Sequence, residues 1–436
     1  MIRENGTQLD RWITRQAQHS ADMMEQAISA TQLVRRREAF GQIVVPAKGS
    51  VLASPAIANW NPEPDYFFHW LRDSAIVMRR VAELMGDAQS GTERQRWRRH
   101  FEDFVRFSLM LCGAPARSSQ WEMTRREFRK FLRPETEMRA LTGDKLLGEP
   151  RFNPDGTCDI FRWSRPQHDG PALRALACLR YLAAGGPQTD ELVALLRLDL
   201  GFTLRHAGRR CVGPWEEAAA HHYYVALVQL GALAHGRAWA EDTDIWSRAE
   251  RRLRSSLDRH WSEKHQVYMA ARPATADCAD DLIDASTLLA VLDADLLDGP
   301  HSVGDPRVQK TQQKIEDVFA REFPINHARP AGQGPALGRY RVDRYFGGGA
   351  WYPTTLAAAS LCYRLAQHPG EDHAALVKRG DAFMETVRAL TPADGALSEQ
   401  VDRATGAQTS ARNLSWSYAA FIDAARLRAQ ALGSRV

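Results

Sequence analysis

Apolar side chains recur at helical spacing along nearly the whole chain, and Gly, Pro and polar clusters interrupt them repeatedly. This pattern predicts about twelve substantial helices. Alternation typical of strands is nearly absent, except around Gly41–Ser54. In chain order, the helices are expected over residues 8–40, 70–86, 92–113, 168–185, 189–207, 216–236, 240–259, 280–293, 306–323, 350–367, 372–389 and 412–431.

The expected helices form consecutive pairs whose two members differ in character. The first member is amphipathic and charged, as in Asp242–His260, whereas the second is rich in Ala, Leu and other small residues, as in Gly170–Leu179. A helix that is apolar nearly all round is buried. We therefore expect six outer helices around six inner ones, which is an all-α (α/α)6 barrel. Because no linker-like segment interrupts the pattern, a single domain is expected over residues 1–436.

Composition adds few constraints beyond those of an ordinary globular protein. Hydrophobic residues make up 44% of the chain and charged residues 25%, with a net charge of +4. The basic run Glu93–His100 is interpreted as the solvated face of one helix, so no nucleic-acid partner is expected. The cysteines show no metal-ligand spacing, and His221–His222 are interpreted as helix surface or barrel packing. The sequence therefore predicts neither a metal nor a cofactor.

The location of the protein is predicted from segments that the sequence lacks. The first residues contain no apolar segment of the signal-peptide type, and no apolar stretch is long enough to span a membrane. We expect a monomeric cytoplasmic protein without membrane partners, or an extracellular one if a leader was removed before residue 1.

Loops dense in Trp, Tyr, Arg and Asp directly precede several expected inner helices. Examples are Tyr66–Asp73, Trp163–Asp169 and Arg339–Tyr345. Aromatic faces stack on sugar rings, and Arg and Asp exchange hydrogen bonds with sugar hydroxyls. Equivalent loops of a helical toroid emerge on one face, so these loops predict one carbohydrate pocket. The inner helices are expected to begin near Trp70, His168, Glu216, Asp281, Ala350 and Arg412.

Two glutamates supply candidate chemistry for this pocket. Glu216 lies in Trp215–Glu217 at the start of an apolar stretch, and Glu399 follows the turn Pro392–Gly395. Two carboxylates that face each other across a sugar site cleave glycosidic bonds. Taken alone, Glu216 is also explained as a capping residue at a helix N-terminus. Glu399 could likewise be a solvated loop acid, and Arg72–Asp73 could be a structural ion pair.

Together these segments resemble the glucoamylase family of glycoside hydrolases, family fifteen. They occur in family order, and the resemblance covers nearly the whole chain as a catalytic domain only. Neither a starch-binding module nor the N-terminal β-sandwich of many bacterial relatives is expected. The matching pieces are Tyr66–Ser74, Gly148–Asn153, Trp163–Arg174, Trp215–Glu217, Gly338–Trp351 and Leu397–Tyr418.

The resemblance implies an inverting exo-hydrolase that removes glucose from non-reducing ends of α-glucans and needs no cofactor. It implies Glu216 as the general acid, kept protonated in an apolar Trp-lined setting, and Glu399 as the general base. Inversion requires the two carboxyl groups to lie ~6.5–9.5 Å apart. Tyr66 is implied as the partner of the water beside Glu399. The other implied substrate contacts are Trp70, Arg72, Asp73, Trp163, Trp215, Glu217, Arg339, Tyr345 and Trp351.

Three positions depart from the family pattern and leave the substrate linkage open. Gly213 stands where fungal members carry Asp, Ala219 where they carry Asn, and Arg151 replaces the Lys of their GEPKFN segment. An α-1,6-glucosidase or a trehalase is therefore an alternative to an α-1,4-glucosidase. A non-catalytic carbohydrate-sensing protein on the same barrel is an alternative of another class, although retention of both glutamates argues against it.

Overall fold

The computed structural model describes residues 7–59, 63–113, 120–272 and 283–433. The contacts within the chain divide it into two compact units. The first unit comprises Met1–Glu25, Ala58–Pro64 and Leu257–Val436, and the second comprises Gln26–Ile57 and Asp65–Ser256. The single domain over residues 1–436 stays a prediction, as do the monomeric state and the cytoplasmic location.

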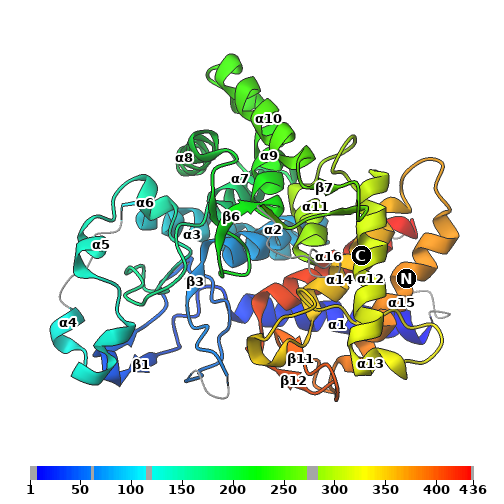
Figure 1. Ribbon diagram of the computed structural model, residues 1–436. Coiled ribbons are helices and arrows are strands. Elements are labelled where there is room, and N and C mark those ends of the chain that lie inside the picture. Colours follow the sequence, from blue (N-terminus) through cyan, green and yellow to red (C-terminus); the bar gives the residue numbers. More distant parts are fainter. Residues whose placement is uncertain (1–6, 60–62, 114–119, 273–282, 434–436) are drawn as a thin grey trace. The chain divides into compact units, whose positions relative to one another are not determined.

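Three inner helices form the centre of the second unit (Figure 1). Helix α7 (Asp169–Ala183) packs against both α2 (Leu71–Asp87) and α9 (Tyr223–His235). The outer helix α3 (Gly91–Cys112) packs on α2, and α8 (Asp190–His206) packs on α7. Nearly all side chains of α9 are buried, because its sequence is apolar on every side. The remaining helices of this unit are α4 (Gln120–Met123), α5 (Glu135–Arg139), α6 (Asp144–Leu147) and the amphipathic α10 (Thr243–Asp258).

The first unit repeats this arrangement. Its inner helix α14 (Tyr352–Leu365) packs against both α11 (Ser286–Ala294) and α16 (Ser415–Ala431). Helix α15 (His373–Leu390) covers α14, and helix α1 meets α16 through edge-to-face packing of Trp12 on Phe421. The other bounds are Gln8–Gln26 for α1, Pro306–Glu322 for α12 and Pro324–His327 for α13.

Each of the twelve expected helices has a counterpart, but three boundaries are wrong. The helix expected from residue 280 begins at Ser286, and the described residues 283–285 before it are not helical. The first helix ends at Gln26 rather than near residue 40, because Ser29 takes a positive φ of 53° and the chain turns away. The helix expected from residue 216 begins at Tyr223, since a strand pair occupies the preceding residues. The expected helix start near Asp281 lies outside the described residues.

Short antiparallel strand pairs fasten the segments that precede the inner helices. Strand β3 (His69–Trp70) pairs with β4 (Arg151–Phe152) and leads into α2, and β6 (Ala219–His222) pairs with β5 (Cys211–Val212) and leads into α9. In the first unit β10 (Ala350–Trp351) pairs with β11 (Gln400–Val401), which pairs with β12 (Gln408–Thr409). The other strands are β1 (Arg35–Arg37), β2 (Gln42–Val44), β7 (Trp261–Ser262), β8 (Val267–Tyr268) and β9 (Ala271–Arg272).

The inward face of the β1–β2 hairpin carries Arg35, Arg37 and Gln42 beside Val44, whereas Arg36 and Ile43 face outward. Arg35 and Arg37 are buried and donate to Oδ2 of Asp65 at 3.0 and 2.9 Å. Ile43, on the opposite face, is 61% exposed. Oδ1 of Asp65 accepts from the backbone N–H of Phe67 at 3.1 Å, so the inward arginines orient the segment that leads to β3.

The described residues contain neither a membrane-spanning helix nor a group of side chains suited to bind a metal ion. No described helix combines the length and apolar character needed to cross a bilayer. Within the same residues no group of three or more His, Cys, Asp or Glu side chains could hold a metal ion. His221 and His222 lie in strand β6, so their assignment to a helix surface is wrong.

One buried ion pair, Arg174–Asp199, joins α7 to α8. Arg174 donates from Nε and Nη2 to the two carboxylate oxygens, each at 2.8 Å, and both side chains are at most 1% exposed. We predict that Asp199→Ala lowers the free energy of unfolding by about 3–5 kcal/mol, because it leaves a buried cation unpaired. Chemical denaturation followed by circular dichroism measures this loss.

The exposed pair Glu135–Arg139 is the matched control, since its side chains are 38% and 70% exposed. Glu135→Ala is expected to cost no more than about 1 kcal/mol. Equal losses in the two variants would contradict the importance of the buried pair.

Candidate active site

Glu216 lies in the turn of the β5–β6 hairpin, seven residues before α9 begins. Its backbone N–H donates to the carbonyl of Gly213 at 3.0 Å, and its φ of 63° is in the left-handed region. Such a conformation is costly for a residue with a β-carbon and persists where the surrounding structure fixes it. The prediction that Glu216 stands at a helix N-terminus is therefore wrong, and helix capping does not explain its position.

Four donors from two other segments converge on the Glu216 carboxylate. Oε1 accepts from Trp70 Nε1 at 2.9 Å, from Gln167 Nε2 at 2.8 Å and from Arg72 Nη2 at 3.2 Å. Oε2 accepts from Trp163 Nε1 at 2.7 Å. The expected apolar setting is wrong on this point, because the indoles present their N–H groups rather than only their ring faces.

Backbone pairing places these donors beside the hairpin. Trp70 ends β3, where its register partner is Arg151 of β4. Gln167 forms a parallel bridge with Val212, whose N–H donates to the carbonyl of Pro166 at 2.9 Å. Main-chain hydrogen bonds thus join segments that are far apart in sequence, and this pairing places their side chains near one another.

Arg72 connects three carboxylates in the second unit. Its Nη1 donates to Oδ2 of Asp169 at 2.8 Å and its Nη2 to Glu216, while its Nε lies 3.7 Å from Oδ1 of Asp73. Burial opposes the positive charge, but Asp169, Glu216 and Asp73 outweigh it and raise the pKa of Arg72. The guanidinium therefore stays charged and holds these acids in fixed positions.

Asp73 has the most perturbed carboxyl group of this cluster. Burial raises the pKa of Asp73 to about 7; Arg72 opposes this rise, whereas the charges of Glu216 and Asp169 add to it. A strongly perturbed acid in a cluster of charges is typical of functional sites. Arg72 and Asp73 are both buried and form an ion pair at 3.7 Å, so their interpretation as a structural ion pair stays a prediction beside that of a substrate-binding pair.

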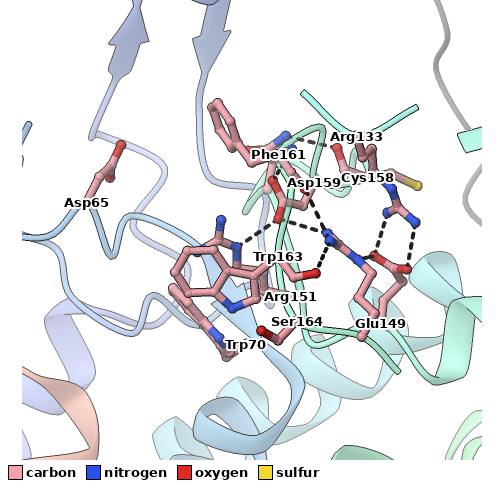
Figure 2. A network of polar contacts seen from close by, with 12 residues as sticks. Asp65, Trp70, Arg133, Glu149, Arg151, Cys158, Asp159, Phe161, Trp163 and Ser164 are labelled. Carbon is pink, nitrogen blue, oxygen red and sulfur yellow. Dashed lines mark hydrogen bonds and ion pairs between the residues drawn. The ribbon is translucent and has the colours of Figure 1, made fainter. Parts of the chain in front are cut away.

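Aromatic rings surround the Glu216 donors. Tyr66 lies 5.1 Å from Trp70 between ring centroids, and Trp163 lies 6.2 Å from Trp70 at an interplanar angle of 72°. Figure 2 shows Trp70 and Trp163 next to Arg151, with a network of ion pairs behind them. These rings supply the aromatic surface that a sugar site requires.

The hairpin turn also carries the two neighbours of Glu216. Trp215 is half-buried and Glu217 is exposed. A β-carbon at position 213 would lie 2.5 Å from Nδ1 of His222, so the imidazole occupies the space that a larger residue would need. Gly213 is therefore matched to His222, whose Nε2 bonds to the carbonyl of Ala218 at 2.9 Å.

Glu399 lies in the first unit, immediately before β11. Its side chain is buried, and one carboxylate oxygen accepts a hydrogen bond from Ser410 Oγ. Its backbone N–H donates to the carbonyl of Ala411 at 2.8 Å. Glu399 is therefore not a solvated loop acid, because both its main chain and its side chain are held by the segment around β12.

Beside Glu399, Arg339 forms the centre of an aromatic cluster. Arg339 donates from Nε to Oδ2 of Asp343 at 2.7 Å, and its guanidinium lies 5.1 Å from the Tyr345 ring centroid and 5.4 Å from that of Trp351. Trp351 is the register partner of Gln400, the residue after Glu399. Pairing of β10 with β11 therefore brings this cluster next to the second glutamate.

The predicted site residues gather in two groups. The second unit holds Tyr66, Trp70, Arg72, Asp73, Trp163, Trp215, Glu216 and Glu217, and the first holds Arg339, Tyr345, Trp351 and Glu399. The separation of the two glutamates stays a prediction. Sequence reasoning did not name Gln167, Asp169, Asp343 or Ser410 as site residues. All four stood inside segments singled out for other residues, Ser410 in Leu397–Tyr418.

The paired helices and a carboxylate held by indole, amide and guanidinium donors are features of an α-helical glycoside hydrolase. The sequence pattern described as "Glycosyl hydrolases family 15" matches residues 38–426. The chain belongs to this family.

Individual relatives agree with this assignment. The chain is 27% identical to a glucoamylase of Blastobotrys adeninivorans, over 89% of this chain and 69% of that protein. It is 27% identical to an intracellular, sporulation-specific glucoamylase of Saccharomyces cerevisiae, over 88% of this chain and 80% of that protein. The solved glucoamylase of Saccharomycopsis fibuligera superposes with a TM-score of 0.77 at 23% identity, covering 98% of this chain and 96% of that one.

These comparisons confirm the predicted fold class and reaction class. The fold is the (α/α)6 barrel of the family fifteen glucoamylases. The protein is a glycoside hydrolase of the glucoamylase type that acts on oligosaccharide or glucan substrates.

The raised pKa of Asp73 predicts a pH-dependent contribution to stability. The folded protein keeps a proton on Asp73 up to about pH 7, whereas the unfolded chain loses it near the ordinary value of 3.8. Stability contributed by this group is therefore present at low pH and falls as pH rises through this window. The fall amounts to at most about 4 kcal/mol, at 1.36 kcal/mol for each of roughly three pKa units.

Asp73→Asn removes this titration. Between pH 4 and pH 7 the wild type should lose stability that the variant does not lose. The melting temperature of Asp73→Asn minus that of the wild type, measured by thermal unfolding, should therefore increase over this range. Glu241→Gln, at a side chain that is 81% exposed, is the control and should show a constant difference. A constant difference for Asp73→Asn as well would contradict the raised pKa.

Proposed function

We propose that this protein is an inverting, exo-acting α-glucosidase that releases β-D-glucose from the non-reducing ends of maltooligosaccharides or α-glucans. The observation that carries the proposal is the Glu216 carboxylate, which four donors from two other segments hold in one orientation. Glu399, whose carboxylate accepts a hydrogen bond from Ser410, is the second carboxylate that glycoside hydrolysis requires.

Glu216 is the proposed general acid. It gives its proton to the glycosidic oxygen as the bond to the anomeric carbon breaks. The negative charge that then develops on Glu216 is met by the indole, amide and guanidinium donors already in place. Donors that are fixed where charge develops stabilise the transition state without reorganisation.

Glu399 is the proposed general base. It takes a proton from a water molecule that attacks the anomeric carbon on the opposite face of the sugar, so the configuration inverts. Ser410 fixes one of its carboxylate oxygens, which orients the group for this transfer. The proton lost by Glu216 is balanced by the proton gained at Glu399, and solvent exchange restores both groups.

Exo action is proposed to come from a closed subsite for the terminal glucose. Arg72, Asp73 and Arg339 are buried side chains with complementary donor and acceptor groups for ring hydroxyls. Because buried polar groups must be paired, a sugar without the matching hydroxyls is rejected. Trp163 and Trp351 are proposed as the aromatic walls of this subsite.

Isosteric variants of the two glutamates test their roles. We predict that Glu216→Gln and Glu399→Gln each reduce kcat on maltotriose by on the order of 10²-fold or more, because each removes a positioned acid or base. Binding of maltotriose, followed by isothermal calorimetry, should remain detectable in both variants. Glu217→Gln changes an adjacent acid of the same turn and is the control; it should retain more activity than Glu216→Gln.

The stereochemistry of the product tests inversion independently. Proton NMR of the first-formed glucose should show the β-anomer, and initial α-anomer would refute the proposed mechanism. A crystal structure with bound glucose should place the two carboxyl groups ~6.5–9.5 Å apart, whereas ~5–5.5 Å would indicate a retaining enzyme.

The linkage preference is proposed to be α-1,4, with α-1,6 and α,α-1,1 as the alternatives to be tested. The β5–β6 turn differs from fungal relatives at Gly213 and Ala219, and the ring of His222 fills the space beside Gly213. A panel of maltose, maltotriose, isomaltose and trehalose should give the highest kcat/KM on the α-1,4 substrates. A higher value on isomaltose or trehalose would instead assign one of the alternatives.

A further inference from the structure

Arg151 lies next to both indoles that bind Glu216 (Figure 2). It is the register partner of Trp70 in the β3–β4 pair. The centre of its guanidinium lies 3.7 Å from the ring centroid of Trp163 and 4.8 Å from that of Trp70. The ring of Phe68 is 4.1 Å away. One planar cation therefore contacts three aromatic rings at once.

A single buried carboxylate anchors this cation. Arg151 donates from Nε to Oδ2 of Asp159 at 2.9 Å, and neither side chain is exposed. Asp159 is itself fixed by Arg165 Nη2 at 3.0 Å and by the N–H of Phe161 at 3.0 Å. Among the described residues, neither Nη atom of Arg151 has a hydrogen-bond partner. The rest of the guanidinium is thus held by its attraction to the ring faces.

We propose that Arg151 is a positioning residue that holds Trp70 and Trp163 so that both indole N–H groups point at the Glu216 carboxylate. Its catalytic consequence rests on the proposed function, in which Glu216 is the acid. Arg151 does not touch the reacting atoms, and it acts by fixing the two donors. The family lysine noted at this position cannot do this in the same way, because an ammonium is a point charge, whereas a guanidinium stacks on rings while its Nε binds a carboxylate.

The competing explanation is that Arg151 is only one more cation in a stabilising network. Arg133 provides a matched control, because it is also buried and donates from Nη1 to Glu149 at 2.9 Å. Glu149 keeps a second partner in Arg165 Nε at 2.8 Å, and the other partner of Arg133, Glu137, is 56% exposed, so a variant of Arg133 leaves no buried carboxylate unpaired. No contact of Arg133 with Trp70 or Trp163 accompanies this pair in the part of the chain that the structure describes.

The first experiment observes the indoles without any substrate. Indole ¹⁵N–¹H signals of Trp70 and Trp163 are assigned with Trp70→Phe and Trp163→Phe, and then compared in Arg151→Met, Arg151→Lys and Arg133→Met. Loss of a strong hydrogen bond moves an indole proton to higher field. We expect both signals to move in Arg151→Met, to move less in Arg151→Lys and to stay in place in Arg133→Met. Unmoved signals in both Arg151 variants would overturn the proposal.

The second experiment measures the catalytic consequence. On maltotriose, Arg151→Met should lose kcat/KM by on the order of 10- to 10²-fold, the effect of misplaced catalytic groups, and Arg151→Lys should recover part of it. Misplacing the two indole donors should also change the pH dependence of kcat/KM, which a merely structural role would leave as it is. Arg133→Met should lower the melting temperature but leave kcat/KM and the pH profile of folded enzyme unchanged.

The outcomes separate this proposal from the proposed function. If wild-type protein releases no glucose from any α-glucoside, the proposed function fails, yet the indole signals still decide the role of Arg151. If the wild type is active and both Arg151 variants show the wild-type pH profile and kcat/KM, the positioning role fails while the proposed function stands. Should Arg151→Met not fold, Arg151→Lys keeps the cation and provides the same readouts.

Discussion

A carboxylate placed among aromatic rings must be met by hydrogen-bond donors, because an unpaired charge in such surroundings costs several kcal/mol or more. The Glu216 side chain, only 13% exposed, imposes this requirement on the second unit. Its donors come from the start of α2 and from the segment before α7. Strand pairing, the inward arginines and the ion pairs behind Trp163 all bring these segments to one carboxylate. The strand pairs and ion pairs of the second unit therefore serve to position the donors of the Glu216 carboxylate.

Much of the fold could be predicted from the sequence, because packed helices leave a strong periodic signal. Helices such as α8 and α15 were expected to within one or two residues, since polar breakers bound them on both sides. The exceptions have a common cause. The strands before α2 and α9 are two to four residues long, too short for alternation to show, so the residues of β6 were assigned to the following helix. Likewise, the triplet Arg35–Arg37 pairs as a strand because of Asp65, a contact distant in sequence.

The candidate site was predicted less evenly. Trp, Arg and Asp in one short motif are chemically conspicuous, and Trp70, Arg72 and Trp163 do lie at Glu216. The environment of Glu216 was not predictable, since a Trp in a sequence suggests an apolar surface and does not reveal where its N–H points. Ser410 was missed because one serine among many carries no signal until a fold places it beside Glu399. Residue types thus singled out several side chains that gather at Glu216, whereas contacts distant in sequence define its hydrogen bonds.

The inverted polarity of the β1–β2 hairpin has a consequence for how the sequence of this protein can vary. In most proteins, hydropathy indicates which surface positions accept substitution, with polar positions being the permissive ones. Here the relation is reversed, because Arg35 and Arg37 are buried on Asp65 while Ile43 faces outward. A library that spared aliphatic positions and varied arginines would disrupt the support of the Trp70 segment and leave the permissive face untouched. Divergence among relatives should therefore accumulate at Ile43, which a hydropathy plot marks as core, and spare Arg35 and Arg37; the buried Val44 follows the usual rule.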